Sequence, residues 1–284
     1  MTLIAAVAMV MTGCSKPDAP KQVFLDPALA PLVPNDTTVM VGARIDKLAK
    51  TPAFDTFSQF RAVEDFAVQS GIDPATRLYQ LIFASNGKRG VVLGRGKFTN
   101  GIIAPDLARK GAAESHYKGM AMYGDEKESM LFLNASTALL GETSLVKAVA
   151  DQEHTGTLSA KIAGLLPGIP YEAQVWGVYG GGDVDVKLPG NLANLQNVLK
   201  MLDSGMFYVT VDTPARDAQS PDTKANATKA YDTKAHVTAV GTARTEESAR
   251  DLKGALQALM ALGKIAGDVQ QNGTQVRVKA DLGL

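Results

Sequence analysis

The sequence LYQLIFASNGKRGVVLGRGK, residues 78–97, carries the clearest structural signal in the chain. Two runs rich in aliphatic and β-branched residues, 78–85 and 90–97, flank the dipeptide Asn86-Gly87. Asparagine followed by glycine tolerates the positive φ angles of a tight primed turn, so this arrangement predicts a β-hairpin. An antiparallel sheet is therefore the starting point for the rest of the fold.

The residues on both sides of the hairpin predict a mixed first half. Residues 36–45 are typical of a strand, and Thr51-Pro52 then supply an N-cap and a favoured first helical residue. A short helix at 105–111 and a helix that ends near Ala150 are also expected. Three further strands are predicted at 117–123, 130–134 and 137–140.

A polar segment, residues 151–159, separates this half from a second one. In the second half Thr245 caps a long helix that begins at Glu246, and leucines at helical spacing predict another helix over 192–202. Its strands are predicted at 171–179, 206–211, 235–243 and 274–280. Both halves then have the order strand, helix, strand, strand, helix, strand, which we interpret as a diverged internal duplication.

The predicted fold class is α+β, with two diverged β-α-β-β-α-β (ferredoxin-like) halves whose helices pack on a mainly antiparallel sheet. The halves are assigned to residues 35–152 and 157–284. They either lie side by side or share one long sheet, and both arrangements fit the sequence.

The N-terminus has the features of an export signal. Leu3–Met11 is an apolar run of a length that fits a signal peptide and falls short of a membrane-spanning helix. Met11-Thr12-Gly13-Cys14 follows and resembles the lipobox of bacterial lipoproteins. This resemblance implies a signal peptide over residues 1–13, cleavage before Cys14 and acylation of Cys14. In that family Ser15 after the cysteine implies an outer membrane location, with the protein facing the periplasm.

Residues 14–34 are expected to form a tether, because Ser15–Gln22 is polar and contains proline. The Val33-Pro34-Asn35-Asp36-Thr37 lead-in also resembles uncharacterised bacterial envelope lipoproteins, a group that implies no activity or site residues.

Composition excludes several classes of function. The chain has 284 residues, is 45% hydrophobic, and carries 29 basic and 29 acidic residues. A disordered chain would have fewer apolar residues or a larger net charge. A general nucleic-acid binder would need a basic surplus, so no nucleic-acid partner is expected. The single cysteine excludes a disulfide framework and a multi-cysteine metal site.

No catalytic constellation is evident in the sequence. The histidines His116, His154 and His236 lie far apart and form no metal-ligand pair, and no nucleophile elbow or phosphate loop is present. We therefore expect no enzyme activity, no metal and no cofactor. Trp176 is predicted to lie in the core, on the opposite face of its strand from Tyr179.

The arginines Arg44 and Arg244 lie near predicted strand ends, where they would occupy equivalent places if the halves are related. An anion site there is one interpretation, and ordinary surface arginines are the other.

Three hypotheses for function follow. The first is a non-catalytic interaction or scaffold module, lipid-anchored at the membrane, with another envelope protein as its partner. The alternative is a lipoprotein that binds a small molecule, lipid or peptide in a groove between the halves, which a deep apolar pocket would favour. The third is an envelope hydrolase that uses dispersed carboxylates.

Overall fold

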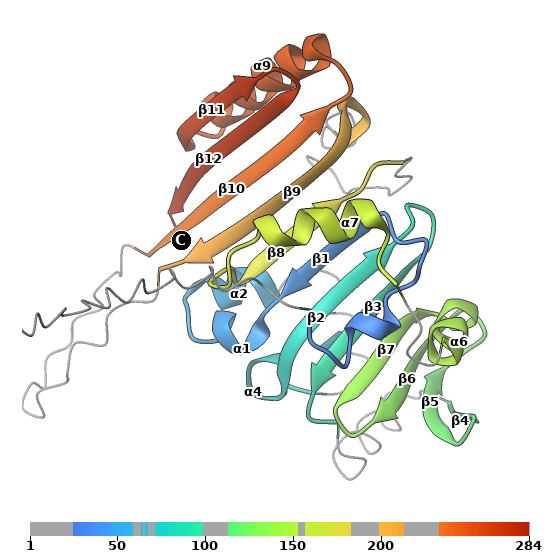
Figure 1. Ribbon diagram of the computed structural model, residues 1–284. Coiled ribbons are helices and arrows are strands. Elements are labelled where there is room, and N and C mark those ends of the chain that lie inside the picture. Colours follow the sequence, from blue (N-terminus) through green and yellow to red (C-terminus); the bar gives the residue numbers. More distant parts are fainter. Residues whose placement is uncertain are drawn as a thin grey trace, which may run out of the picture.

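The computed structural model describes residues 25–58, 64, 66–67, 72–98, 113–152, 157–182, 199–212 and 233–283. These residues form a mixed α+β fold built on one twelve-stranded sheet (Figure 1). The order of strands across the sheet is β11-β12-β10-β9-β8-β1-β2-β3-β7-β6-β5-β4, and neighbours pair antiparallel throughout. The predicted α+β class with a mainly antiparallel sheet is confirmed.

The elements follow the predicted ones closely in several places. The first strands are β1 (Val39–Ala43), β2 (Leu78–Ser85), β3 (Gly90–Gly96), β4 (Glu114–Tyr117), β5 (Met120–Gly124), β6 (Glu128–Asn134) and β7 (Thr137–Glu142). The later strands are β8 (Val175–Tyr179), β9 (Leu202–Val211), β10 (Lys234–Ala243), β11 (Ala266–Asn272) and β12 (Gln275–Gly283). The helices are η1 (Ala30–Leu32), α1 (Ile45–Leu48), α2 (Ala53–Ser58), α4 (Pro74–Arg77), α6 (Thr143–Asp151), α7 (Ala160–Leu165), η2 (Leu166–Gly168) and α9 (Glu246–Leu262).

The hairpin predicted at Asn86-Gly87 is confirmed. Strands β2 and β3 pair antiparallel up to Ser85 and Gly90, and Gly87 takes a φ of 89° in the turn. The Asn86 side-chain oxygen accepts hydrogen bonds from the backbone N–H groups of Lys88 and Arg89 at 3.0 and 2.9 Å. Both hydrogen bonds are made to a residue of the turn itself, so the turn is stabilised locally. It can therefore be predicted from the neighbouring residues of the sequence.

The sheet is continuous from one half to the other. Its centre is the β1–β8 pair, where Val39 lies opposite Tyr179 and Ala43 lies opposite Val175. Outward from this seam the first half runs β1-β2-β3-β7-β6 and the second runs β8-β9-β10-β12-β11. Strands β5 and β4 extend the first half further. Of the two arrangements left open by the sequence, the chain adopts one shared sheet.

The ferredoxin-like detail of the prediction is not confirmed. In a β-α-β unit the helix connects parallel strands. Here α1, α2 and α4 lie between β1 and β2 in the chain, yet β1 and β2 are adjacent and antiparallel. In this segment the helices therefore form an excursion within a meander. Helix α9 differs, because it joins β10 to β11, which both pair antiparallel with β12 and so run parallel to each other.

Two predicted segments differ in the structure. The single strand expected at 117–123 is a hairpin, because Lys118 and Gly119 have φ angles of 50° and 80° and form a turn between β4 and β5. The tether predicted over 14–34 is packed structure from Leu25 onward. Leu29 and Val33 are fully buried, and the Gln152 side chain donates a hydrogen bond to the Val33 carbonyl at 3.0 Å.

Some sequence predictions lie outside the described residues. These are the signal peptide, Cys14, Ser15–Gln22 and the helix at 105–111. Of the helix expected over 192–202, only the last residues are described: 199–201 are helical and Leu202 begins β9.

Helices cover both faces of the sheet. Helices η1, α6 and α7 pack on one face around Met40, Leu93 and Trp176. Helices α1 and α2 pack on the other face near Ala43, and α9 packs on that same face at the second half, where Val39 joins its cluster. No helix within the described part of the chain is long and apolar enough to cross a membrane.

Candidate functional site

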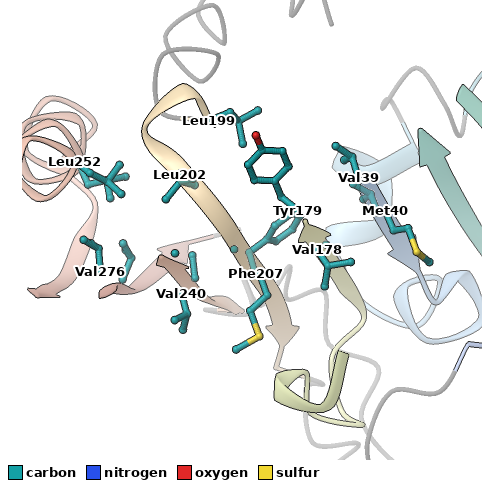
Figure 2. A pocket seen from close by; sticks show the side chains of 18 of the residues that line it. Val39, Met40, Val178, Tyr179, Leu199, Leu202, Phe207, Val240, Leu252 and Val276 are labelled. Carbon is teal, nitrogen blue, oxygen red and sulfur yellow. The ribbon is translucent and has the colours of Figure 1, made fainter. Parts of the chain in front are cut away.

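A cavity of about 460 Å³ lies on the face that carries α9 and α1, at the seam between the halves (Figure 2). Strands β1, β2, β8, β9, β10 and β12 form its floor, and residues of α9 and the start of β9 form its walls. Among the described residues, α1 and α2 belong to one hydrophobic cluster on this face and α9 to another. The cavity lies between them, since it is lined by Phe83, which packs on the first cluster, and by Leu252 of the second.

Two rows of residues that run across the strands make the floor. The first row joins, strand by strand, Val39, Tyr179, Gly205, Gly241 and Val276. The second row joins Phe83, Val41, Gly177, Phe207, Ala239 and Val278. All of these residues line the cavity. The first row has two glycines side by side, Gly205 and Gly241, and the second has Gly177 beside Phe207.

The glycines of these rows are unusual for strand interiors. Glycine weakens a strand and often marks a position where a ligand or another group approaches the backbone closely. A Cβ atom added at Gly177 would lie 2.2 Å from the Phe207 ring, and one added at Gly241 would lie 2.7 Å from Leu202. Neighbouring side chains therefore already occupy the space over these two glycines.

Gly205 is different from the other two glycines. A Cβ atom added there would lie 3.7 Å from the nearest side-chain atom, on Leu202. The closest atom of any kind would be the Val240 carbonyl oxygen at 3.2 Å. No side chain in the described structure fills the space over Gly205, so this position marks the open part of the hollow.

The walls are apolar. Leu252 of α9 lies on one side of the cavity and Val39 of β1 on the other, with Leu202, Tyr179 and Phe207 between them (Figure 2). The Tyr179 hydroxyl donates a hydrogen bond to the Gly182 carbonyl at 2.6 Å. No charged side chain is among the described residues that line the cavity.

This lining can bind but offers little chemistry. A pocket of a few hundred Å³ with apolar walls gains affinity by removing hydrocarbon from water, at about 25 cal/mol per Å² of apolar surface. Within the described lining, no histidine, carboxylate or thiol is placed to transfer a proton or attack a substrate. Nor do the described residues contain a group of three side chains suited to hold a metal ion.

Trp176 lies in the core, as predicted. Its side chain is fully buried on the face opposite the cavity, and it covers Gly42 so closely that an added Cβ there would lie 2.3 Å from the indole. The indole Nε1 has no hydrogen-bond partner among the described residues. The Gly42–Trp176 pair thus repeats on the other face the pattern of an aromatic ring packed over glycine.

The two arginines do not form one site. The Arg44 side chain donates a hydrogen bond to the Tyr171 carbonyl at 2.8 Å, and its guanidinium lies 4.8 Å from the centre of the Tyr171 ring. Arg244 follows β10, which runs opposite to β1 and is separated from it by β8 and β9. The two arginines therefore lie at opposite ends of the strands that make up the sheet, each beyond the end of its own strand. They do not occupy equivalent places, so that prediction is wrong.

The histidines are also apart. His236 lies between two carboxylates, with Nδ1 2.7 Å from Asp281 and Nε2 3.2 Å from Asp212. Its pKa is raised, mainly by the hydrogen bond to Asp281 and further by Asp212. His116 is exposed, with Nε2 4.0 Å from Glu114. His154 lies outside the described residues.

Comparison with known proteins places the fold only. No protein-family model matches this sequence, and no curated protein matches it. Crystal form III of TP0453 is similar in structure, with a TM-score of 0.58 and 11% identity over 92% of this chain and 95% of that one. Crystal form I of TP0453 has a TM-score of 0.53 at 10% identity, over 92% of this chain and 94% of that one. The likeness at such low identity shows a shared fold across nearly the whole length.

Proposed function

We propose that this chain is a lipid-anchored protein of the bacterial cell envelope whose folded part binds an apolar ligand in the cavity at the seam. The observation that carries this proposal is the open hollow over Gly205, walled by apolar side chains. Of the hypotheses drawn from the sequence, this is the one that a deep apolar pocket favours. The interaction module, with another envelope protein as its partner, remains a prediction.

The energetics of the floor support a binding role. Protein interiors are close-packed, and lining atoms without neighbours lose dispersion energy. Glycine within a strand costs a further ~0.5–1 kcal/mol relative to alanine. A ligand that fills the space over Gly205 would restore these contacts, so a cavity that is a defect in the free protein becomes a site in the complex.

We also propose that the two halves derive from one duplicated unit. The shared strand order on the two sides of the seam supports this, since β1-β2-β3-β7-β6 and β8-β9-β10-β12-β11 follow the chain in the same way once β4 and β5 are set aside. In such a molecule the first strands of the two units, β1 and β8, pair with each other. The cavity then forms where the two units meet, which explains its place in the sheet.

The binding proposal is tested by closing the hollow. Gly205→Val adds branched carbon atoms over the floor, and valine is favoured in strands. We expect the parent protein to bind the neutral probe N-phenyl-1-naphthylamine with enhanced fluorescence and the variant to bind it at least about tenfold more weakly. Titration of purified full-length protein in detergent-free buffer measures this difference.

A matched control separates the site from the substitution. Gly283→Val places the same side chain on β12, where an added Cβ meets no atom within 4 Å. This control should bind the probe as the parent does. Equal binding by the parent and both variants would overturn the proposal.

The anchor is tested independently at Cys14. Growth of expressing cells with an alkyne-labelled fatty acid should label the parent, and Cys14→Ala should remove the label. Equal labelling of parent and variant would contradict acylation at this residue. The outcome leaves the binding proposal untouched, because the binding test compares variants at Gly205 and Gly283 and does not depend on acylation.

A further inference from the structure

The hollow has the shape of a slot. Along β9, Leu202 and Phe207 lie on the two sides of Gly205, and on the β10 side Leu202 covers Gly241, the cross-strand neighbour of Gly205. Same-face neighbours on a strand are about 7 Å apart, and adjacent strands are about 4.8 Å apart. The open space over the floor is therefore about one residue wide, and Leu202 and Phe207 bound it. Tyr179 closes the same row on β8.

The lining offers no partner to a polar group inside the slot. The hydroxyl of Tyr179 is the polar side-chain group of the described lining, and it donates to Gly182. The backbone groups of the floor belong to antiparallel ladders. A polar ligand group placed there would lose its hydrogen bonds to water without replacement, which is costly.

From the shape and the chemistry together we infer that the ligand moiety held in the slot is a single unbranched hydrocarbon chain, whose end occupies the space over Gly205 between Leu202 and Phe207. This inference rests on the proposed function and names its ligand class. The row is wide enough for one extended chain and too narrow for a fused ring system that lies flat on the sheet. Any polar head of the ligand stays outside the slot.

The volume fits such a chain. The cavity of about 460 Å³ has room for more than ten methylene groups, if each takes about 30 Å³, the share of a water molecule in the liquid. The chain of a free fatty acid and an acyl chain of a phospholipid share this chemistry. The two molecules differ in their head groups. A comparison of the affinities for a free fatty acid and for a phospholipid therefore shows which of them supplies the chain.

The test is a chain-length series. Calorimetric titration of full-length protein with octan-1-ol, decan-1-ol, dodecan-1-ol and tetradecan-1-ol should give affinities that rise by about fourfold per added methylene while the chain still fits. 1-Pyrenemethanol, a flat ring system, should bind more weakly than dodecan-1-ol. Gly205→Val should remove the dependence on length, and Gly283→Val should keep it. Competition by palmitate against 1-palmitoyl-lysophosphatidylcholine then identifies the source.

The outcomes separate the two proposals. Tighter binding of 1-pyrenemethanol than of dodecan-1-ol, without a length dependence, overturns the hydrocarbon chain. The proposed function would survive that result if Gly205→Val still abolished binding of 1-pyrenemethanol. No binding of any of these compounds by the parent protein overturns both.

Discussion

The two sides of the sheet seam share a strand order but differ in packing. In β2 and β3 most residues are buried, and Ile82 and Leu93 are fully buried in the cluster that also contains Leu32 of η1 and Val146 of α6. In β10 only Ala235 and Ala243 are buried, and the residues between them remain partly exposed. A sheet that is continuous in its hydrogen bonds is therefore uneven in its cover, and the candidate site lies where the cover thins.

Helix α9 explains much of this difference. It buries Ala249 and Leu252 against the sheet, whereas Leu259 is 42% exposed and Leu262 is 82% exposed. In the first half, by contrast, α1 and α2 pack on one face, and η1 and α6 pack on the other. We conclude that the first half is the more completely packed of the two, and that the second half carries the more exposed part of the sheet.

The largest expected effect that tests this contrast is a difference in stability between two glycine-to-alanine variants, one in each half. In Gly94→Ala on β3 the new Cβ would lie 2.3 Å from the Phe66 ring, and overpacking of this kind costs about 1–3 kcal/mol. In Gly205→Ala on β9 the nearest side-chain atom is 3.7 Å away. Alanine restricts the unfolded chain more than glycine does, so folding costs less conformational entropy in this variant. The resulting stabilisation of about 0.4–1 kcal/mol offsets the slight crowding of the new Cβ.

Urea unfolding of the two variants measures the difference as a shift of the midpoint at constant slope. We expect a clear loss for Gly94→Ala and a midpoint within error of the parent for Gly205→Ala. Similar losses in both variants would mean that the space over Gly205 is as tightly filled as the space over Gly94. The cavity would then be no site.

Local signals in the sequence were sufficient for part of the fold. The hairpin at Asn86-Gly87 and the cap at Thr245 depend on neighbouring residues, and the Thr245 hydroxyl does accept from the Ser248 N–H at 3.0 Å. Strand β11 was missed because only Val269 in it is buried, although Asn272-Gly273 beside it is the same turn signal. A polar edge strand has no apolar alternation to reveal it.

Long-range pairing explains what the sequence could not show. The direction of β2 relative to β1 depends on how the chain returns after α1 and α2, which no local pattern encodes. The floor of the cavity joins Gly177, Gly205 and Gly241, which are far apart in the chain and meet only through strand register. Gly177 and Gly241 inside predicted strands were the available signal, since strands normally exclude glycine. Gly205 lies just before the strand predicted at 206–211, so it gave no such signal. The buried Leu29 and Val33 were likewise hidden by the polar residues that precede them.

The smallest effect expected in the second half concerns His236, which connects the ends of three strands. Its raised pKa means that the folded state binds a proton more tightly than the unfolded state, whose pKa is about 6.5. The protonated imidazole donates to Asp281 and Asp212, and this stabilisation is complete below the unfolded pKa. It is lost as pH rises through the folded pKa, so the parent should become slightly less stable from about pH 6 upward. An exposed pair of this kind contributes only about 0–1 kcal/mol.

His236→Gln should flatten this dependence of the unfolding midpoint on pH, whereas His116→Gln should leave it as in the parent. His116 makes a suitable control because it is also exposed and lies 4.0 Å from its nearest carboxylate partner, too far for a hydrogen bond. If both variants kept the slope of the parent, the carboxylates around His236 would not hold the strand ends in solution. If both lost it, the dependence would belong to the net charge of the protein rather than to this contact between β9, β10 and β12.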